Sequence, residues 1–343
     1  MPLSSPQQYA DMLDAAHAGG YALPAVNVTS SQTLNAALTG FAEAASDGIV
    51  QITVGGASYL SGGGRPVEGA RALAAMASEL ARRVPVAVAL HTDHCPPSHV
   101  AGFLDPLLSV STARAAAGEP PLFASHMFDG SSLPLEENLA TARVLLDRCR
   151  AAGVVLEVEV GVVGGEEDGI TGAIDERLYT TIGDLLRTAD VLGTGERGRY
   201  LLAATFGNVH GLQPPGPVRL RPEILREGQR ALAGRFAGAR FEYVFHGSSG
   251  ASDEDLHRAV AYGVVKVNLD SEAQYAYTRA AAGHMFAEYD GVLMIDGAAG
   301  RKAAYDPRAW GAKAEGAMAA RVAEACAVVG SAGRTLLGRA VEA

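Results

Sequence analysis

Two hydrophobic patterns alternate along most of the chain. Short runs of apolar and β-branched residues are typical of buried strands, and the Ala-rich stretches between them place apolar residues at helical spacing. Eight runs are candidate strands: YALPAVNV, GIVQITVGG, VPVAVALHTDH, PLFASHMFD, VVLEVEVG, YLLAATFGN, FEYVFHG and GVVKVNL. Stretches such as TLNAALTGFAEAAS and VEGARALAAMASELARRV supply the helices. This alternation predicts parallel strands, because a parallel connection needs a helix-sized crossover.

The polar residues at the ends of these runs favour a closed barrel over a doubly wound open sheet. Polar side chains end most of the runs: Asn27, Asp93, His94, Asp129, Asn208, His210, His246, Asn268 and Asp270. An open sheet brings together only the strands near its switch point, whereas a barrel gathers all eight ends. The sequence therefore predicts an α/β fold, a (β/α)8 TIM barrel forming one domain over residues 1–343. The Ala-rich region from Trp310 onward predicts additional C-terminal helices.

Composition and charge exclude several classes of protein. The net charge of −10 argues against nucleic-acid binding, which needs a basic face. No apolar run approaches the length of a membrane span, and the first residues lack the basic and apolar regions of a signal peptide. Three cysteines without a CxxC pair suit a reducing compartment. We therefore expect a cytoplasmic protein that binds neither nucleic acid nor membrane.

Strand geometry groups some of these polar residues. Residues two apart share a face of a strand, so Glu157 and Glu159 lie together. By the same rule Lys266, Asn268 and Asp270 share a face of the last strand. Asp93 and His94 are adjacent and cannot both point inward from a regular strand. The chain must therefore turn there, which the following prolines favour.

Three of the nine histidines end apolar runs: His94, His210 and His246. Neutral imidazole is the commonest metal ligand, and three histidines with an open position form a known type of catalytic zinc site. Ordinary hydrogen-bonded core histidines are the alternative. The others include His17, His257 and His284, which fall in helical stretches and need no special role. Spacing alone leaves both interpretations open.

Two loops carry further candidate chemistry. In EVGVVGGEEDGITG, glycines surround Glu166, Glu167 and Asp168, which suits either a solvated acidic loop or a mobile lid that carries a carboxylate. HGSSG and NLDS follow the last two strands, where barrels often bind phosphate. Turns use the same residues, so position alone favours the phosphate site.

Several stretches together resemble the class II, metal-dependent fructose-bisphosphate aldolases, in the longer dimeric subtype. The matching stretches are HTDHC, SHMFDGS, LEVEVGVVGGEEDG, FGNVHG, VFHGSSG, VVKVNLDSE and YDPRAW, in family order from Pro24 to Trp310. The resemblance implies reversible cleavage of fructose 1,6-bisphosphate to dihydroxyacetone phosphate and glyceraldehyde 3-phosphate through a metal-stabilised enediolate, in glycolysis and gluconeogenesis. It also implies a homodimer acting on sugar phosphates.

The resemblance also implies roles for individual residues. His94, His210 and His246 would hold a catalytic Zn²⁺, replaceable by other divalent metals, with Glu159 and Asp129 as alternative or second ligands. Asp93 would handle the C4 hydroxyl proton and Glu167 the carbon-bound proton. A monovalent cation, Na⁺ or K⁺, would bind near the loops after the sixth and seventh strands. The implied substrate-binding residues are Asn27, Thr53, Gly211, Gly247, Ser248, Ser249, Asn268, Leu269, Asp270, Ser271 and Arg308, the arginine serving the partner subunit's site.

Three departures from the family pattern bear on specificity. Ser248 replaces a usual glycine, Ser271 a usual threonine and Thr53 a usual serine. Small size or the hydroxyl is kept, so we expect activity, while a related ketose bisphosphate of the sedoheptulose or tagatose type remains an alternative substrate.

Two rival functions remain at this point. A Schiff-base enzyme could use Lys266, but it would leave three strand-end histidines unexplained. A non-catalytic sugar-phosphate or metal-binding protein would have no use for the acid/base pair of Asp93 and Glu167.

Overall fold

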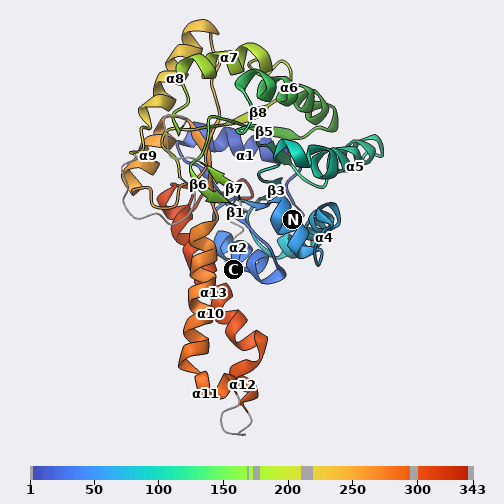
Figure 1. Ribbon diagram of the computed structural model, residues 1–343, viewed down its shortest axis with the longest axis vertical. Helices are drawn as coiled ribbons and strands as arrows, with labels where there is room; N and C mark the ends of the chain where they lie inside the picture. Colours follow the sequence, from blue (N-terminus) through green and yellow to red (C-terminus); the bar gives the residue numbers. More distant parts are fainter. Residues whose placement is uncertain (1–2, 168–169, 173–177, 210–218, 294–299, 339–343) are drawn as a thin grey trace.

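A computed structural model describes residues 3–167, 170–172, 178–209, 219–293 and 300–338; for residues 165–167 and 170–172 it describes the backbone alone. Eight parallel strands form a closed barrel in the order β1-β10-β9-β8-β5-β4-β3-β2, surrounded by helices (Figure 1). The predicted (β/α)8 barrel is confirmed, and each of the eight predicted runs contains one barrel strand. The strands are β1 Leu23–Asn27, β2 Gly48–Ile52, β3 Val88–Thr92, β4 Ser125–Phe128, β5 Val155–Val160, β8 Tyr200–Ala204, β9 Tyr243–Phe245 and β10 Val264–Leu269.

Helices follow the strands and are bounded by recognisable caps. Ser30 begins α2 with a capping box to Thr33, Thr181 begins α7 in the same way with Asp184, and left-handed Gly153 ends α6. The helices are α1 Pro6–Gly19, α2 Ser31–Glu43, α3 Val54–Leu60, α4 Pro66–Leu80, α5 Asp105–Ala116, α6 Leu135–Ala152, α7 Ile182–Leu192, α8 Glu223–Arg235, α9 Asp253–Ala261, α10 Ser271–Ala287, α11 Tyr289–Val292, α12 Lys302–Tyr305 and α13 Pro307–Val328. Single helical turns cover Ala81–Arg83, Pro97–His99 and Val100–Leu104.

Helix α1 closes the N-terminal end of the barrel. Its side chains Tyr9, Met12 and Leu13 are fully buried and belong to one apolar cluster with inward-facing residues such as Leu23 and Ile49. A second, larger core fills the space between the outer faces of the strands and the helices. Because α1 fills the N-terminal end of the barrel, a ligand can enter the interior only from the C-terminal ends of the strands.

The predicted C-terminal helix exists, but part of it belongs to the ring around the barrel. Helix α13 contacts α2, α9, α10 and β1, and its residues Met318, Val322 and Cys326 join the main core. The other half of α13 pairs with α10 to form a hairpin that projects from the barrel, with α11 and α12 at its far end (Figure 1). We call α10, α11, α12 and this part of α13 the projecting hairpin.

The glycine-rich stretch that follows β5 forms two short antiparallel strands. These are β6 Gly165–Glu167 and β7 Ile170–Gly172, paired from Gly165 with Gly172 to Glu167 with Ile170. Gly164, directly before β6, pairs with Val209 in the segment after β8. That the β6–β7 hairpin moves as a lid stays a prediction.

Among the described residues, none of the helices is both long and apolar enough to cross a membrane.

Candidate active site

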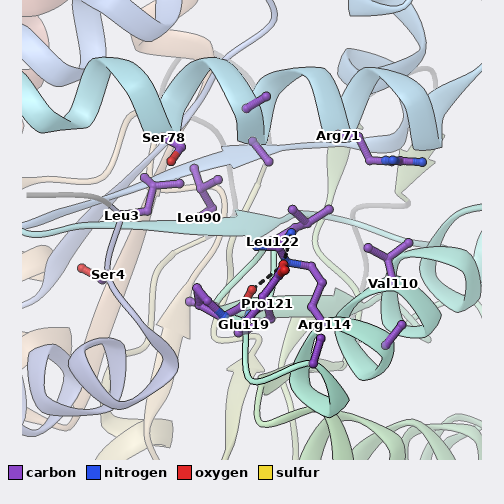
Figure 2. A pocket seen from close by; sticks show the side chains of 16 residues that line it. Leu3, Ser4, Arg71, Ser78, Leu90, Val110, Arg114, Glu119, Pro121 and Leu122 are labelled. Carbon is purple, nitrogen blue, oxygen red and sulfur yellow. Dashed lines mark hydrogen bonds and ion pairs between the residues drawn. The ribbon is translucent and has the colours of Figure 1, made fainter.

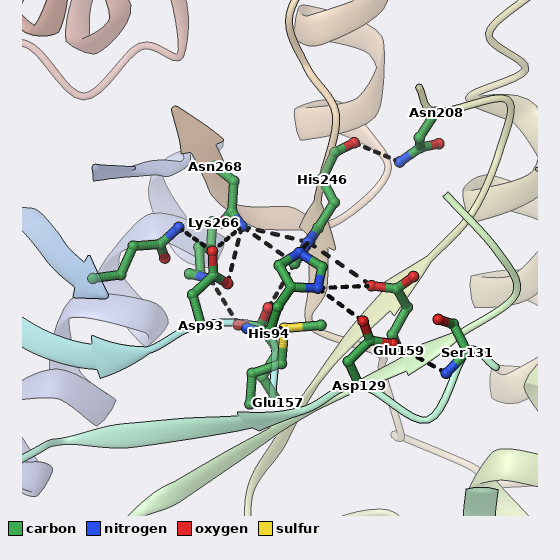
Figure 3. Close-up of polar contacts among 12 residues, drawn as sticks. Asp93, His94, Asp129, Ser131, Glu157, Glu159, Asn208, His246, Lys266 and Asn268 are labelled. Carbon is green, nitrogen blue, oxygen red and sulfur yellow. Dashed lines mark hydrogen bonds and ion pairs between the residues drawn. The ribbon is translucent and has the colours of Figure 1, made fainter. Parts of the chain in front are cut away.

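The C-terminal strand ends bring a dense set of polar side chains together (Figure 3). They come from β3, β4, β5, β9 and β10 or from the residues that directly follow these strands. The set comprises Asp93, His94, Asp129, Glu157, Glu159, His246, Lys266 and Asn268. Barrel closure therefore brings together Asp93, His94, Asp129, His246 and Asn268 from the predicted strand ends, because parallel strands end on one side of a barrel.

The predicted turn after β3 is present. Strand β3 ends at Thr92, and His94 has a φ of +29°, which is rare for a residue with a side chain. The His94 backbone N–H points to the Met127 sulfur at 3.3 Å. The turn lets both Asp93 and His94 reach the site although they are neighbours. Such a conformation costs of the order of 1–3 kcal/mol and tends to occur at functional sites.

The imidazoles of His94 and His246 face each other in a geometry suited to a cation. Nε2 of His94 lies 2.8 Å from Nδ1 of His246, and the two rings are nearly perpendicular at 85°. The outer nitrogens contact carboxylates: His94 Nδ1 lies 3.0 Å from Asp129 Oδ2, and His246 Nε2 lies 2.7 Å from Glu157 Oε1.

Those carboxylates decide which ring nitrogens carry hydrogen. An ionised carboxylate only accepts, so the outer nitrogens donate and the inner nitrogens present lone pairs to each other. Two facing lone pairs repel, and a metal ion bound by both would relieve that repulsion. A carboxylate on the far nitrogen of a metal-binding histidine is also a common arrangement. The residues present therefore fit a metal.

Other carboxylates surround the two rings. Glu159 Oε2 lies 3.9 Å from His94 Nδ1 and 3.9 Å from His246 Nδ1. Ligand atoms of Asp93, His94 and His246 lie within 4.8 Å of one another, as do those of His94, Asp129 and Glu159. The predicted third histidine, His210, and the neighbouring Gly211 lie outside the described residues. Asn208 nearby donates from Nδ2 to the His246 carbonyl at 2.8 Å, which ties the two strand ends together.

Burial and charge set the protonation of these groups. Burial by itself would raise the pKa of Asp129, but the hydrogen bond from His94 lowers that pKa to about 2. Burial would likewise raise the pKa of Glu157, and Lys266, His91 and His246 together hold it well below its usual range. Burial lowers the pKa of His246, with Glu157 opposing. Ionised carboxylates and a neutral imidazole are the forms that bind or support a metal.

Asp93 is completely buried and accepts hydrogen bonds from three side-chain amides. Gln51 Nε2 lies 2.9 Å from Oδ2, Asn27 Nδ2 lies 3.2 Å from Oδ2, and Asn268 Nδ2 lies 3.3 Å from Oδ1. The three amides therefore fix the orientation of the Asp93 carboxylate.

Gln51 is a site residue that the sequence reasoning missed. It lies in β2, where every residue is buried, and it also contacts the Asn27 side-chain oxygen. A glutamine inside the run GIVQITV, on the same face as Thr53, is the signal that could have identified it.

The predicted phosphate loops follow β9 and β10. Gly247 has a φ of +61°, and a Cβ there would lie 2.8 Å from the Val209 backbone, so this position requires glycine. The Ser248 hydroxyl donates to the Asn268 carbonyl at 2.7 Å, which links the two loops. Asp270 accepts from the Gln274 amide at 2.7 Å, one turn into α10.

The remaining predicted substrate residues occupy different settings. Thr53 accepts from the Gly56 N–H at 3.0 Å and begins α3. The Leu269 side chain is buried in the core, so only its backbone can face a ligand. Ser249 follows Ser248 in the β9 loop, and Ser271 is the first residue of α10.

Arg308 does not join these residues within the chain. Its side chain is 87% exposed and forms an ion pair with Asp306 at 2.7 Å. It lies in the first turn of α13, directly after α12 at the far end of the projecting hairpin (Figure 1). Glu167 lies on β6, and Asp168 lies outside the described residues.

Lys266 is not placed as a Schiff-base nucleophile. Its side chain is fully buried, and Nζ donates to Glu157 Oε2 at 2.8 Å. An ammonium in such a pair has no lone pair for attack on a carbonyl, which argues against the Schiff-base rival.

A separate hollow lies away from these residues. It has a volume of about 720 Å³, lies beside α4 and α5, and is lined by residues such as Arg71, Leu90 and Arg114 (Figure 2). None of the predicted site residues lines it, so the chemistry concentrates at the strand ends instead.

A closed (β/α)8 barrel whose strand ends hold two facing imidazoles, with carboxylates around them, is an arrangement suited to a metal-dependent barrel enzyme. Comparison with known proteins makes this more specific, because residues 7–334 match the family model described as fructose-bisphosphate aldolase class-II. The chain belongs to this family. It is an aldolase, a lyase that cleaves fructose 1,6-bisphosphate, and its family is metal-dependent, which removes the non-catalytic rival.

Individual relatives cover nearly the whole chain. A fructose-bisphosphate aldolase from Streptomyces galbus is 57% identical over 98% of this chain and 100% of its own length. One from Mycobacterium tuberculosis (strain ATCC 25618 / H37Rv) is 52% identical over 98% of this chain and 99% of its own. The crystal structure of the Campylobacter jejuni fructose-bisphosphate aldolase has a TM-score of 0.84 at 33% identity, covering 97% of both chains.

Proposed function

We propose that the aldolase uses a zinc ion held by His94, His210 and His246, with Glu159 and Asp129 as alternative or second ligands. The observation that carries this proposal is the pair of inner nitrogens, 2.8 Å apart, whose outer partners are carboxylates. Three protein ligands with one open position suit a catalytic zinc, and imidazole also suits cobalt, nickel and iron. When bound, such a metal supplies a Lewis acid that stabilises negative charge on substrate oxygens.

Asp93 is proposed to exchange the proton of the C4 hydroxyl. Its carboxylate lies beside His94, and the amides of Asn27, Gln51 and Asn268 hold it in place. In the cleavage direction an ionised carboxylate can accept the hydroxyl proton as the carbon–carbon bond breaks. General acid–base catalysis of this kind contributes about 10²–10⁴ in rate.

Glu167 is proposed to transfer the proton on the carbon of dihydroxyacetone phosphate that forms the new bond. It ends β6, and this small sheet begins beside Gly164, which pairs with Val209 in the segment after β8. That pairing supports a location at the rim of the site. Closure of the β6–β7 hairpin over substrate would bring the carboxylate to the reacting carbon and exclude water.

The substrate phosphates are assigned to two ends of the site. One phosphate would bind the loops after β9 and β10 and near Gly211, where backbone N–H groups and hydroxyls surround the anion. The residues are Gly211, Gly247, Ser248, Ser249, Leu269, Asp270 and Ser271, with Asn268 beside the reacting carbons. A Na⁺ or K⁺ ion near the loops after β8 and β9 would assist.

The other phosphate would meet Asn27, Thr53 and the partner subunit's Arg308 in a homodimer. The projecting hairpin supports this assembly, because it exposes several large apolar side chains that a second copy could cover. They are Tyr275, Phe286, Tyr289, Leu293 and Tyr305, between 44% and 80% exposed. We also assign the enzyme to the cytoplasm, since all three cysteines are free and buried. We assign the whole chain to a single barrel domain, since its eight parallel strands close into one barrel.

Separating the two proton transfers tests these assignments. Dihydroxyacetone phosphate alone can exchange its carbon-bound proton with solvent, a reaction without a C4 hydroxyl. Glu167→Gln should therefore lose both cleavage and exchange. Asp93→Ala should lose cleavage by a much larger factor than it loses exchange. Each of these losses of activity should be about 10²–10⁴. NMR of the methylene signal in deuterated buffer measures exchange. Wild-type exchange in Glu167→Gln would assign the carbon proton to another residue.

A further inference from the structure

A buried ion pair lies beneath the two imidazoles, and the proton transfers proposed above do not use it. Lys266 on β10 donates from Nζ to Glu157 Oε2 on β5 at 2.8 Å, and both side chains are 0% exposed. β8 and β9 separate these two strands in the barrel order, so the pair spans the barrel interior. Buried ion pairs are often no more stabilising than apolar residues of the same size. Stability alone therefore does not account for the pair.

The two oxygens of Glu157 have different partners. Oε2 accepts from Lys266, and His91 Nε2 lies 3.6 Å from the same oxygen. Oε1 lies 2.7 Å from His246 Nε2. With Lys266 fixing one oxygen, the carboxylate cannot rotate, and the other oxygen remains aimed at the His246 ring.

This contact selects one form of the His246 imidazole. An ionised carboxylate can only accept, so Nε2 must carry the hydrogen and Nδ1 must present its lone pair. Nδ1 is the nitrogen that faces His94 Nε2 at 2.8 Å. The corresponding partner of His94 is less enclosed, since Asp129 is 14% exposed while Glu157 is 0% exposed.

We propose that Lys266 and Glu157 are positioning residues that hold His246 in the form presenting Nδ1 to the metal. This role rests on the proposed metal site and adds the residues that orient one of its ligands. Lys266 acts through Glu157: it holds the carboxylate in the orientation that accepts from His246 Nε2, and thereby prevents the ring from turning its N–H toward His94. Partners of this kind typically change metal affinity by about 10–100-fold.

Metal affinity tests the proposal without reference to catalysis. Co²⁺ serves as the probe, and competition with a chelator gives its dissociation constant in the full-length protein. Lys266→Met removes the charge at similar length and should weaken Co²⁺ binding by about 10–100-fold. Glu157→Gln replaces an obligate acceptor with a group that can also donate, and should weaken binding within the same range.

A spectroscopic signature separates positioning from general loosening of the barrel. In the Co²⁺ protein, the exchangeable Nε2–H proton of His246 should give a slowly exchanging NMR signal because Glu157 accepts it. That signal should be absent from His246→Ala, which assigns it, and should broaden by faster solvent exchange in Lys266→Met. An unchanged signal in folded Lys266→Met would overturn the proposal.

A matched control uses an ion pair at the opposite end of the barrel. Arg199 directly precedes β8, and its Nε lies 2.7 Å from Glu242, directly before β9. Arg199→Met should leave Co²⁺ affinity within about twofold of wild type, because this pair contacts neither imidazole. An equal loss of affinity in Arg199→Met and Lys266→Met would contradict a positioning role.

A double variant tests the proposal if Lys266→Met fails to fold. If Lys266→Met alone does not fold, the double variant with Glu157→Gln removes both charges and should fold while binding Co²⁺ about 10–100-fold more weakly. Wild-type affinity in the folded single or double variant overturns the inference and leaves the proposed metal site intact. A wild-type protein that binds no Co²⁺ would instead remove the proposed metal site itself.

Discussion

At the scale of single residues, each imidazole at the strand ends is positioned by a neighbour that only the folded chain supplies. His94 and His246 could be recognised in the sequence because they end apolar runs. Their pairing with Asp129 and Glu157 could not, since those contacts depend on how the strands are arranged in the barrel. The same holds for Gln51, which reaches Asp93 only because β2 and β3 are adjacent.

Removing either imidazole should remove the metal. We expect His94→Ala and His246→Ala to lose tightly bound metal and nearly all cleavage activity, because each deletes one of two facing donor nitrogens. Elemental analysis of purified protein measures the metal. His99→Ala is the control, since His99 is exposed and lies only five residues beyond His94. Full metal occupancy in His246→Ala would refute its assignment as a ligand.

At the scale of elements, the alternating pattern predicted all eight barrel strands, because buried parallel strands need continuous apolar runs. The placement of two helices was not predictable in the same way. An amphipathic helix shows which face is buried but not the surface that it covers, so the sequence did not reveal that α1 closes the barrel bottom. Nor did it show that α13 packs between α9 and α2 while its other half projects.

The projecting hairpin should connect two active sites. Arg308 lies near its far end and is exposed, so Arg308→Ala should weaken binding of fructose 1,6-bisphosphate more than that of dihydroxyacetone phosphate, which lacks the distant phosphate. Mixing inactive Arg308→Ala with inactive His94→Ala should restore some cleavage, because one site of each mixed dimer would be intact. Cleavage assays after subunit exchange, verified by mass, measure this. No recovery after proven exchange would contradict a shared site.

At the scale of the whole molecule, buried neutral histidines make stability depend on pH. His126 is fully buried, and burial lowers its pKa from 6.5 to about 3. Below pH 6.5 the unfolded chain therefore takes up a proton that the folded chain does not. Its contribution to stability is complete above pH 6.5 and declines as the pH falls toward about 3.

Replacing this histidine should flatten the acid side of the stability profile. Each pH unit below the pKa of the unfolded state lowers the free energy of unfolding by about 1.4 kcal/mol. At about pH 5 the depressed pKa of His126 therefore lowers the free energy of unfolding by about 2 kcal/mol relative to neutral pH. His126→Gln keeps a polar partner for Thr92, whose hydroxyl lies 2.8 Å from His126 Nδ1, and should lose less stability over that interval. Urea unfolding at both pH values measures the difference. Equal losses in both proteins would show that His126 does not contribute.

We propose that this barrel cleaves fructose 1,6-bisphosphate with a metal bound at His94 and His246. The most direct test is the rate of cleavage before chelation, after complete chelation, and after Zn²⁺, Co²⁺, Ni²⁺ or Fe²⁺ is added back. Chelation should abolish cleavage, dialysis alone should not restore it, and added zinc should. Cleavage at the original rate by protein shown to contain no metal would contradict this proposal.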